Sequence, residues 1–299
     1  ALTDCTTGAN NTAVGMNALA DHTTTNDNVA VGYFSMRYNT TGAQNTAVGK
    51  GSLQTNTTGS YNVAIGDQAM LDSNGSECVA VGHAALFENS TGNYNTALGT
   101  GALRENTTAG YNTAVGRYAL RNNTTGVSNT ALGHNCGQAV TDHNNNTYTG
   151  SDCGRYQTGG NNVAVGTECM EGVSGSTDGD ANVAMGYQAM HVTTTGNNNA
   201  AIGYYSSQAI TTGYRNVSVG AQSLMATTTG YDNTAIGNSA LKDNTTGYLN
   251  TAVGRVALHT NTTGYNNTGM GREALYANTT GNVNCAFGSE ALKSATTAS

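Results

Sequence analysis

Charged side chains are scarce in this sequence, and its few basic residues form no stripe. Eleven Lys and Arg stand against 18 Asp and Glu, so the formal net charge is −7 at pH 7, and only 10% of the residues are charged. Because proteins that bind nucleic acid usually carry a basic face, we expect no nucleic-acid partner. The sequence also lacks the run of 18 or more apolar residues that a membrane-spanning helix requires, so we expect no membrane span.

Helical periodicity is missing as well, and a short repeat takes its place. No window of the sequence shows the i, i+3, i+4, i+7 apolar spacing of an amphipathic helix. Instead, the chain repeats a phrase close to N-T-A-V-G-x-x-A-L-x-x-N-T-T-G-Y-x. The glycine that ends N-T-A-V-G recurs from Gly15 to Gly288, and we call it the marker glycine. It returns at every seventeenth position, as in Gly15, Gly32 and Gly49, except that two spacings are shorter by one residue and one is longer by three.

This repeat predicts an all-β protein. Each copy is too short for a strand–helix–strand unit, and it holds two short segments, T-A-V and A-L, bounded by glycine and by the turn-forming N-T-T-G. The pattern favours a parallel β-solenoid (a β-roll or β-helix) of about seventeen 17-residue coils, with identical positions stacked about 4.8 Å apart. We expect one repeat domain over residues 1–299, with irregular coils at 134–186.

Two rows of large apolar residues are the predicted core. The residue before the marker glycine is Val, Ile, Leu, Met or Phe in nearly every copy, from Val14 to Phe287 (the valine row). The fourth residue after it is Leu or Met in most copies, from Leu19 to Leu292 (the leucine row). Since neighbouring residues of a strand face opposite ways, we expect the adjacent rows of Ala and Ser to point outward.

We further expect the protein to self-associate. Two large apolar side chains per coil make a thin core, so the outward rows of small residues are predicted to pack between protomers. Ala1 and Leu2 are already in phase with the repeat, which suggests a processed chain or part of a longer array. Open solenoid ends present unpaired strand edges, so end-to-end stacking into a filament is a second mode of association.

The repeat resembles two kinds of known repeat. The A-V/I-G-x-x-A pattern, as in Ala252-Val253-Gly254-Arg255-Val256-Ala257, is similar to the head repeats of trimeric autotransporter adhesins, which form a left-handed parallel β-roll assembled as a trimer. The longer phrase N-T-T-G-x-x-N-T-A-V-G-x-x-A-L resembles repeats of phage and virus tail-fibre-like proteins. The resemblance implies a homotrimer at a cell or virion surface. The adhesin repeat is shorter than the one in this chain, so its turns must differ.

Three cysteines share one row. Cys136, Cys153 and Cys169 each follow a marker glycine by three residues, in three consecutive coils. Stacking places their Cα atoms within the range that a disulfide tolerates, so one pair could form a bridge, in an oxidising compartment. Packing of small side chains is the other interpretation. A metal site is disfavoured because no histidine shares the row.

The asparagine of N-T-T-G also recurs in register, and each copy is a glycosylation sequon. Its side chain is predicted either to carry a glycan or, as we favour, to form the turn and hydrogen-bond along the stack. These residues are Asn39, Asn56, Asn89, Asn106, Asn123, Asn244, Asn261 and Asn278.

A shorter row of tyrosines, Tyr214, Tyr231, Tyr248 and Tyr265, recurs with the period of the repeat. Such a ladder could bind sugar rings or a partner surface, and mutual stacking of the rings is the interpretation that we favour.

The repeat is broken between Gly133 and Gly186. Gly137 and Gly154 replace residues of the leucine row, and the segment 172–182 contains a three-residue insertion. Asp178 and Asp180 of this segment could bind a cation, although a tolerant surface loop is the simpler interpretation.

These patterns favour a structural protein over an enzyme. The six histidines are scattered over several rows, and no catalytic arrangement or cofactor is indicated. We expect a non-enzymatic subunit of an extracellular or virion-surface fibre or filament. The first alternative is an adhesin or tail-fibre segment that binds surface glycans. The second is an ice-binding solenoid, which the turn location of the N-T-T-G threonines disfavours.

Overall fold

The computed structural model describes residues 7–21, 24–175 and 178–297. Ala1 and Leu2, on which the expectation of a longer array depends, lie outside these residues. The chain divides into two units, Ala1–Asn146 and Thr147–Ser299, and each is described by itself. The single repeat domain over 1–299 stays a prediction.

Each unit is a stack of three-residue parallel strands, one strand per coil. The first unit contains β1 (Thr12–Val14), β2 (Val29–Val31), β3 (Thr46–Val48), β4 (Val63–Ile65), β5 (Val79–Val81), β6 (Thr96–Leu98), β7 (Thr113–Val115) and β8 (Thr130–Leu132). The second contains β9 (Thr147–Thr149), β10 (Val163–Val165), β11 (Val183–Met185), β12 (Ala200–Ile202), β13 (Val217–Val219), β14 (Thr234–Ile236), β15 (Thr251–Val253), β16 (Thr268–Met270) and β17 (Cys285–Phe287).

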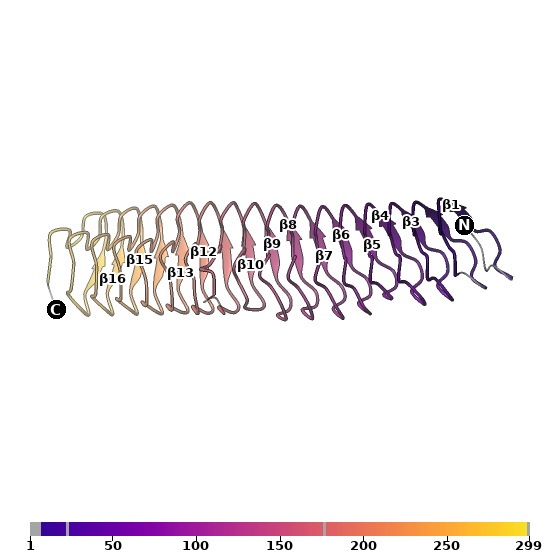
Figure 1. The fold of residues 1–299 in the computed structure, drawn as a ribbon. Helices are drawn as coiled ribbons and strands as arrows, with labels where there is room; N and C mark the ends of the chain where they lie inside the picture. Colours follow the sequence, from indigo (N-terminus) through magenta and orange to yellow (C-terminus); the bar gives the residue numbers. More distant parts are fainter. Residues whose placement is uncertain (1–6, 22–23, 176–177, 298–299) are drawn as a thin grey trace. The chain divides into compact units, whose positions relative to one another are not determined.

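The strands pair in the register of the repeat, which confirms the predicted parallel β-solenoid. In the first unit Ala47 lies between Ala30 and Ala64, and in the second Ala252 lies beside Ala235. Successive strands of a unit therefore lie side by side and point the same way (Figure 1). The described residues form no helix, and hence none that could cross a bilayer.

The A-L segment is a turn rather than a second strand. In the third coil Leu53 has φ of 51°, and its N–H points along the stack to the carbonyl of Ala69, 2.9 Å away. The same left-handed conformation recurs at Met70 and Leu86. Because the chain is not extended here, neighbouring residues do not alternate in direction, and both Ser52 and Leu53 are fully buried. The leucine row is therefore part of the core, as predicted.

The prediction for the valine row was wrong. In β3 the side chain of Ala47 has no exposed surface, whereas Val48 is 37% exposed; Ile65 and Ile236 are 40% and 41% exposed. The strand does alternate, but with the opposite phase, so alanine points in and valine points out. The interior opposite the leucine row accommodates a methyl group and little more. The Ala and Ser rows are consequently inside the coil and do not form an outward surface.

The irregular coils keep the core filled by exchanging large and small side chains. In the second unit Gly154 takes the place of a leucine, and the ring of Tyr148 occupies the position of an inward alanine. A Cβ atom on Gly154 would lie 2.6 Å from Cδ1 of Tyr148, so the two substitutions compensate. In the first unit Gly137 also replaces a leucine, and a buried Val140 stands where other coils have asparagine.

Candidate functional site

The sequon asparagines form hydrogen-bonded ladders inside each unit. All eight side chains are fully buried. Nδ2 of Asn56 donates to the carbonyl of Gly59, which closes the N-T-T-G turn, and to Oδ1 of Asn39 in the preceding coil, at 2.9 and 2.8 Å. Asn261 makes the equivalent bonds to Gly264 and Asn244. The nitrogen that a glycan would modify is thus buried and already donates two hydrogen bonds, which favours the structural interpretation.

Sequence reasoning missed a second asparagine ladder. The residue four positions before the marker glycine is buried as well, and its amide serves three neighbours. Nδ2 of Asn250 donates to the carbonyl of Gly264 and to Oδ1 of Asn233, while its Oδ1 accepts the backbone N–H of Asn267 at 3.0 Å. The signal was available, since asparagine recurs at this position of the repeat. We call this row, from Asn28 to Asn284, the inner asparagine ladder.

The first threonine of N-T-T-G is also a structural residue. The hydroxyl of Thr40 donates to the carbonyl of Thr57 in the next coil at 2.9 Å, and Thr245 donates in the same way to Thr262 at 3.0 Å. These hydroxyl protons are donated to backbone carbonyls of the next coil rather than to water. The row is therefore a poor surface for ordering water.

The tyrosine ladder is a continuous ring stack in the second unit. Neighbouring rings of Tyr214, Tyr231, Tyr248 and Tyr265 are 4.8–5.0 Å apart and within 9° of parallel. The guanidinium of Arg215 lies 4.9 Å from the ring centre of Tyr214. Since a sugar ring binds an aromatic side chain through its face, and the faces between these rings are covered by one another, the geometry favours mutual stacking.

Replacing Tyr231 by Leu should lower the free energy of unfolding by about 1–2 kcal/mol, because it removes two ring contacts of about 0.5–1.5 kcal/mol each. The decrease can be measured by denaturant unfolding followed by circular dichroism. Tyr61, which is 60% exposed in the first unit, provides the control. An equal loss of stability in Tyr61→Leu and Tyr231→Leu would contradict a stabilising role of the stack.

The predicted cysteine row is buried. Cys136 lies in the first unit and Cys153 and Cys169 in the second, and all three are thiols in this structure. A hydrogen bond with Cys153, together with burial, raises the pKa of the Cys169 thiol. Cys153 in turn donates to the carbonyl of Ala164 at 3.3 Å. The row therefore packs small side chains in the core, and a disulfide within it stays a prediction.

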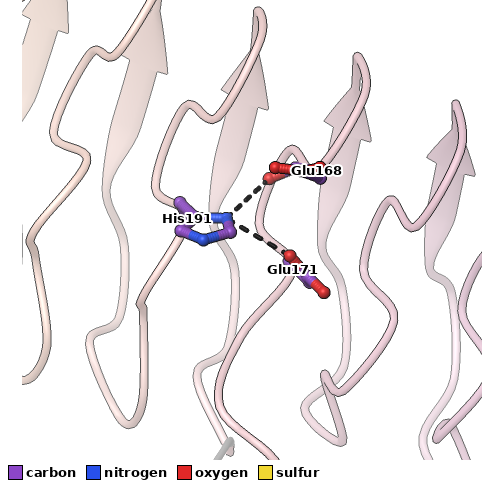
Figure 2. A group of neighbouring side chains, drawn as sticks. All are labelled: Glu168, Glu171 and His191. Atoms are coloured by element: carbon purple, nitrogen blue, oxygen red, sulfur yellow. Dashed lines mark hydrogen bonds and ion pairs between the residues drawn. The ribbon is translucent and has the colours of Figure 1, made fainter.

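A cluster that the sequence analysis did not identify lies on the second unit, where two glutamates of one coil meet a histidine of the next (Figure 2). Glu168 and Glu171 are the second and fifth residues after marker Gly166, and His191 is the fifth after Gly186. One ligand atom from each of the three side chains lies within 4.8 Å of the other two. Nδ1 of His191 is 3.4 Å from Oε2 of Glu171 and 3.2 Å from the carbonyl oxygen of Glu168.

The cluster carries an excess of negative charge. Arg155 Nη1 lies 3.4 Å from Asp152 Oδ1 and 4.0 Å from Glu171 Oε1. Glu168 and Glu171 carry a formal charge of −2 when His191 is neutral, and the guanidinium beside them is shared with Asp152. Partial burial, opposed by His191 and Arg155, raises the pKa of the Glu171 carboxyl above its usual range. The cluster is thus short of positive charge.

The two aspartates of the insertion are not part of this cluster. Oδ1 of Asp180 accepts the backbone N–H of Gly160 at 2.6 Å, and the backbone N–H of Asp178 donates to the carbonyl of Thr194. The Asp180 carboxylate thus fastens the insertion to the preceding coil. A cation held by Asp178 and Asp180 stays a prediction.

Comparison of the sequence with models of known protein families and with curated proteins finds no match.

Proposed function

We propose that this chain is a non-enzymatic structural subunit of an extracellular or virion-surface fibre. The outward valine row is the observation that carries the proposal. In each unit the strands present large apolar side chains to solvent at every coil or nearly so, among them Val48 and Ile65 in the first unit and Ile202 and Ile236 in the second. Most buried amides of the interior are hydrogen-bonded within their own ladders, so the outward valine row is the part of each unit that gains most from a partner.

The size of the surface supports association with a second copy. The eight strands of the first unit and the nine of the second, about 4.8 Å apart, make an outward face about 40 Å long in each unit, and two outward rows make it roughly 10 Å wide. One of the two rows is the valine row, and the other holds threonine in five strands of the first unit and four of the second. A face of about 400 Å² is about half of what one partner buries in a stable interface. The opposing surface would be another copy of the same face, because identical rows at equal spacing interdigitate.

The resemblance to trimeric adhesin heads and tail-fibre repeats agrees with this proposal. A homotrimer would enclose three such faces, whereas a filament would grow by pairing strand edges end to end. Both assemblies make the protein a spacer or shaft at a cell or virion surface.

Adding positive charge to the valine row should dissociate the assembly. We expect the untagged chain to be oligomeric at micromolar concentration and the variants Val48→Lys/Ile65→Lys and Ile202→Lys/Ile236→Lys to become monomeric in sedimentation-velocity experiments. A buried lysine pair that faces its own symmetry copies is strongly unfavourable in an apolar interface.

The matched controls are Thr41→Lys/Thr58→Lys and Thr246→Lys/Thr263→Lys, which add the same charge at exposed turn positions of the same two units. Circular dichroism would establish that all variants keep the β-solenoid. A wild-type chain that stays monomeric at 100 times that concentration, or controls that dissociate as readily, would exclude association through the valine row.

Ice binding is the second candidate, and the outward strand face is the feature that favours it. Thr46 and Val48 point out of β3, and Thr251 and Val253 point out of β15, and an outward threonine begins five strands of the first unit and four of the second. Thermal hysteresis of a monomeric preparation tests this function directly. The glycan-binding alternative is tested by glycan-array binding of the assembled protein.

A further inference from the structure

The cluster of Glu168, Glu171 and His191 has the donor set of a transition-metal site. Two carboxylates and one imidazole are ligands that Zn²⁺ accepts, with metal–ligand distances of about 2.0–2.2 Å. In a tetrahedral site with such distances, neighbouring ligand atoms are separated by about 3.4 Å. The observed separation between Nδ1 of His191 and Oε2 of Glu171 is 3.4 Å. These two side chains are therefore already spaced as two ligands of one ion.

Hydrogen bonds to both neighbouring coils hold Glu168 in this arrangement. Glu168 has φ of 52°, and its N–H donates to the carbonyl of Ser151 in the preceding coil at 2.9 Å. Nε2 of Gln188 donates to Oε2 of Glu168 and orients that carboxylate. These two hydrogen bonds position Glu168 before any ion binds, which lowers the entropy cost of binding.

The charge of the cluster distinguishes it from the other carboxylate group of the same unit. Glu273 and Glu290 lie at the equivalent edge of later coils, but they contact both Arg272 and Lys293, so their two negative charges are matched. Glu168 and Glu171 carry a formal charge of −2, and the guanidinium beside them is shared with Asp152. A divalent cation would neutralise that excess.

We propose that Glu168, Glu171 and His191 bind one zinc ion on the second unit. The ion joins the coil of β10 to the coil of β11, on both sides of the insertion at 172–182. Water completes the coordination. The zinc ion would hold these two coils together at the one place where the repeat is lengthened. This role does not depend on how the protein self-associates.

Zinc binding can be measured on the whole chain, untagged, with Cys5 and Cys285 replaced by Ser to remove two competing thiols. We expect isothermal titration with ZnCl₂ at pH 7.5 to give one site per chain, and Co²⁺ in its place to give the visible absorption of a four-coordinate ion. Glu171→Gln and His191→Ala should each weaken binding by about a hundredfold or more, since each removes one of three protein ligands.

His259→Ala is the matched control. His259 occupies the same position of its coil as His191 and lies 3.6 Å from Asp243, but no second carboxylate of the described residues pairs with it. We expect His259→Ala to bind zinc as the wild type does. Absence of a stoichiometric site in the wild type, or retention of binding in both Glu171→Gln and His191→Ala, would overturn the proposal. Glu171→Gln is nearly isosteric, so the test remains decisive if His191→Ala fails to fold.

Discussion

Gly271→Ala is expected to reduce the free energy of unfolding by about 3–5 kcal/mol, through backbone strain and a clash with the next coil. Gly271 has φ of +133°, a conformation that side chains with a Cβ atom rarely adopt. An added Cβ would lie 2.5 Å from the backbone carbon of Gly288, and closer still to its carbonyl oxygen. Both contacts are with main chain, so no side-chain rotation can relieve them. The coil containing β17 would have to move away, breaking the ladder.

Gly269→Ala, two residues earlier in the same coil, should leave stability unchanged or raise it by about 0.4–1 kcal/mol. Gly269 pairs with Ala252 and Ala286, so alanine already occupies this position in both neighbouring strands. Both variants add one methyl group. The difference between their free energies of unfolding therefore reports how strongly position 271 requires glycine. Denaturant unfolding of both variants, with hydrogen exchange over residues 268–291, would measure it. Equal stabilities would mean that the marker glycine is dispensable.

The sequence predicted those features that follow from stacking equal positions. The period of the repeat determines the parallel register and the number of coils. It also placed the leucine row, the tyrosine row and the sequon asparagines as ladders, since residues one period apart lie about 4.8 Å apart whatever their chemistry. Tyr231 and Tyr248 are accordingly 4.8 Å apart, at the strand spacing.

The direction of the strand side chains could not be predicted in the same way. T-A-V alternates, so either Ala or Thr and Val must point inward, and hydrophobicity alone favours valine. The deciding factor is volume. Leu53 and the amides of Asn45 and Asn56 are fully buried in the same coil as Ala47, which leaves room for a small inward side chain. No residue-by-residue scale places two asparagines per coil in a core and leaves a valine outside.

The carboxylate–histidine cluster was missed for a related reason. Glu171 and His191 occupy the same position of successive coils, but the insertion separates them in the sequence by three residues more than the usual period. Glu168 belongs to a different position of the repeat, and its proximity depends on the turn that brings the second and fifth residues after the marker glycine to one edge. A comparison of residues one period apart cannot reveal a site whose side chains come from two different positions of the repeat.

Asn250→Ala should lower the free energy of unfolding by about 2–5 kcal/mol, because one buried donor loses its acceptor, at about 1–3 kcal/mol, and two buried acceptors each lose one of two hydrogen bonds, at about 0.5–1.5 kcal/mol each, partly offset by relaxation. The backbone N–H of Asn267 loses Oδ1 of Asn250, whereas the carbonyl of Gly264 keeps Nδ2 of Asn261 and Oδ1 of Asn233 keeps the backbone N–H of residue 250. Urea unfolding of the variant would give the loss, and Leu249→Ala, which truncates the exposed neighbouring side chain, is its control.

Cys78 provides the reverse experiment, because it occupies the same position as Asn250 in a coil of the first unit. Its sulfur makes three weak hydrogen bonds, 3.3 Å to the carbonyl of Ser76, 3.4 Å to the carbonyl of Gly92 and 3.5 Å from the backbone N–H of Asn95. Cys78→Asn should therefore raise stability by about 1–2 kcal/mol, as two of these weak sulfur bonds become amide bonds. If Asn250→Ala behaved like Leu249→Ala and Cys78→Asn gave no gain, the inner asparagine ladder would be incidental. The solenoid would then depend on its leucine row and backbone pairing alone.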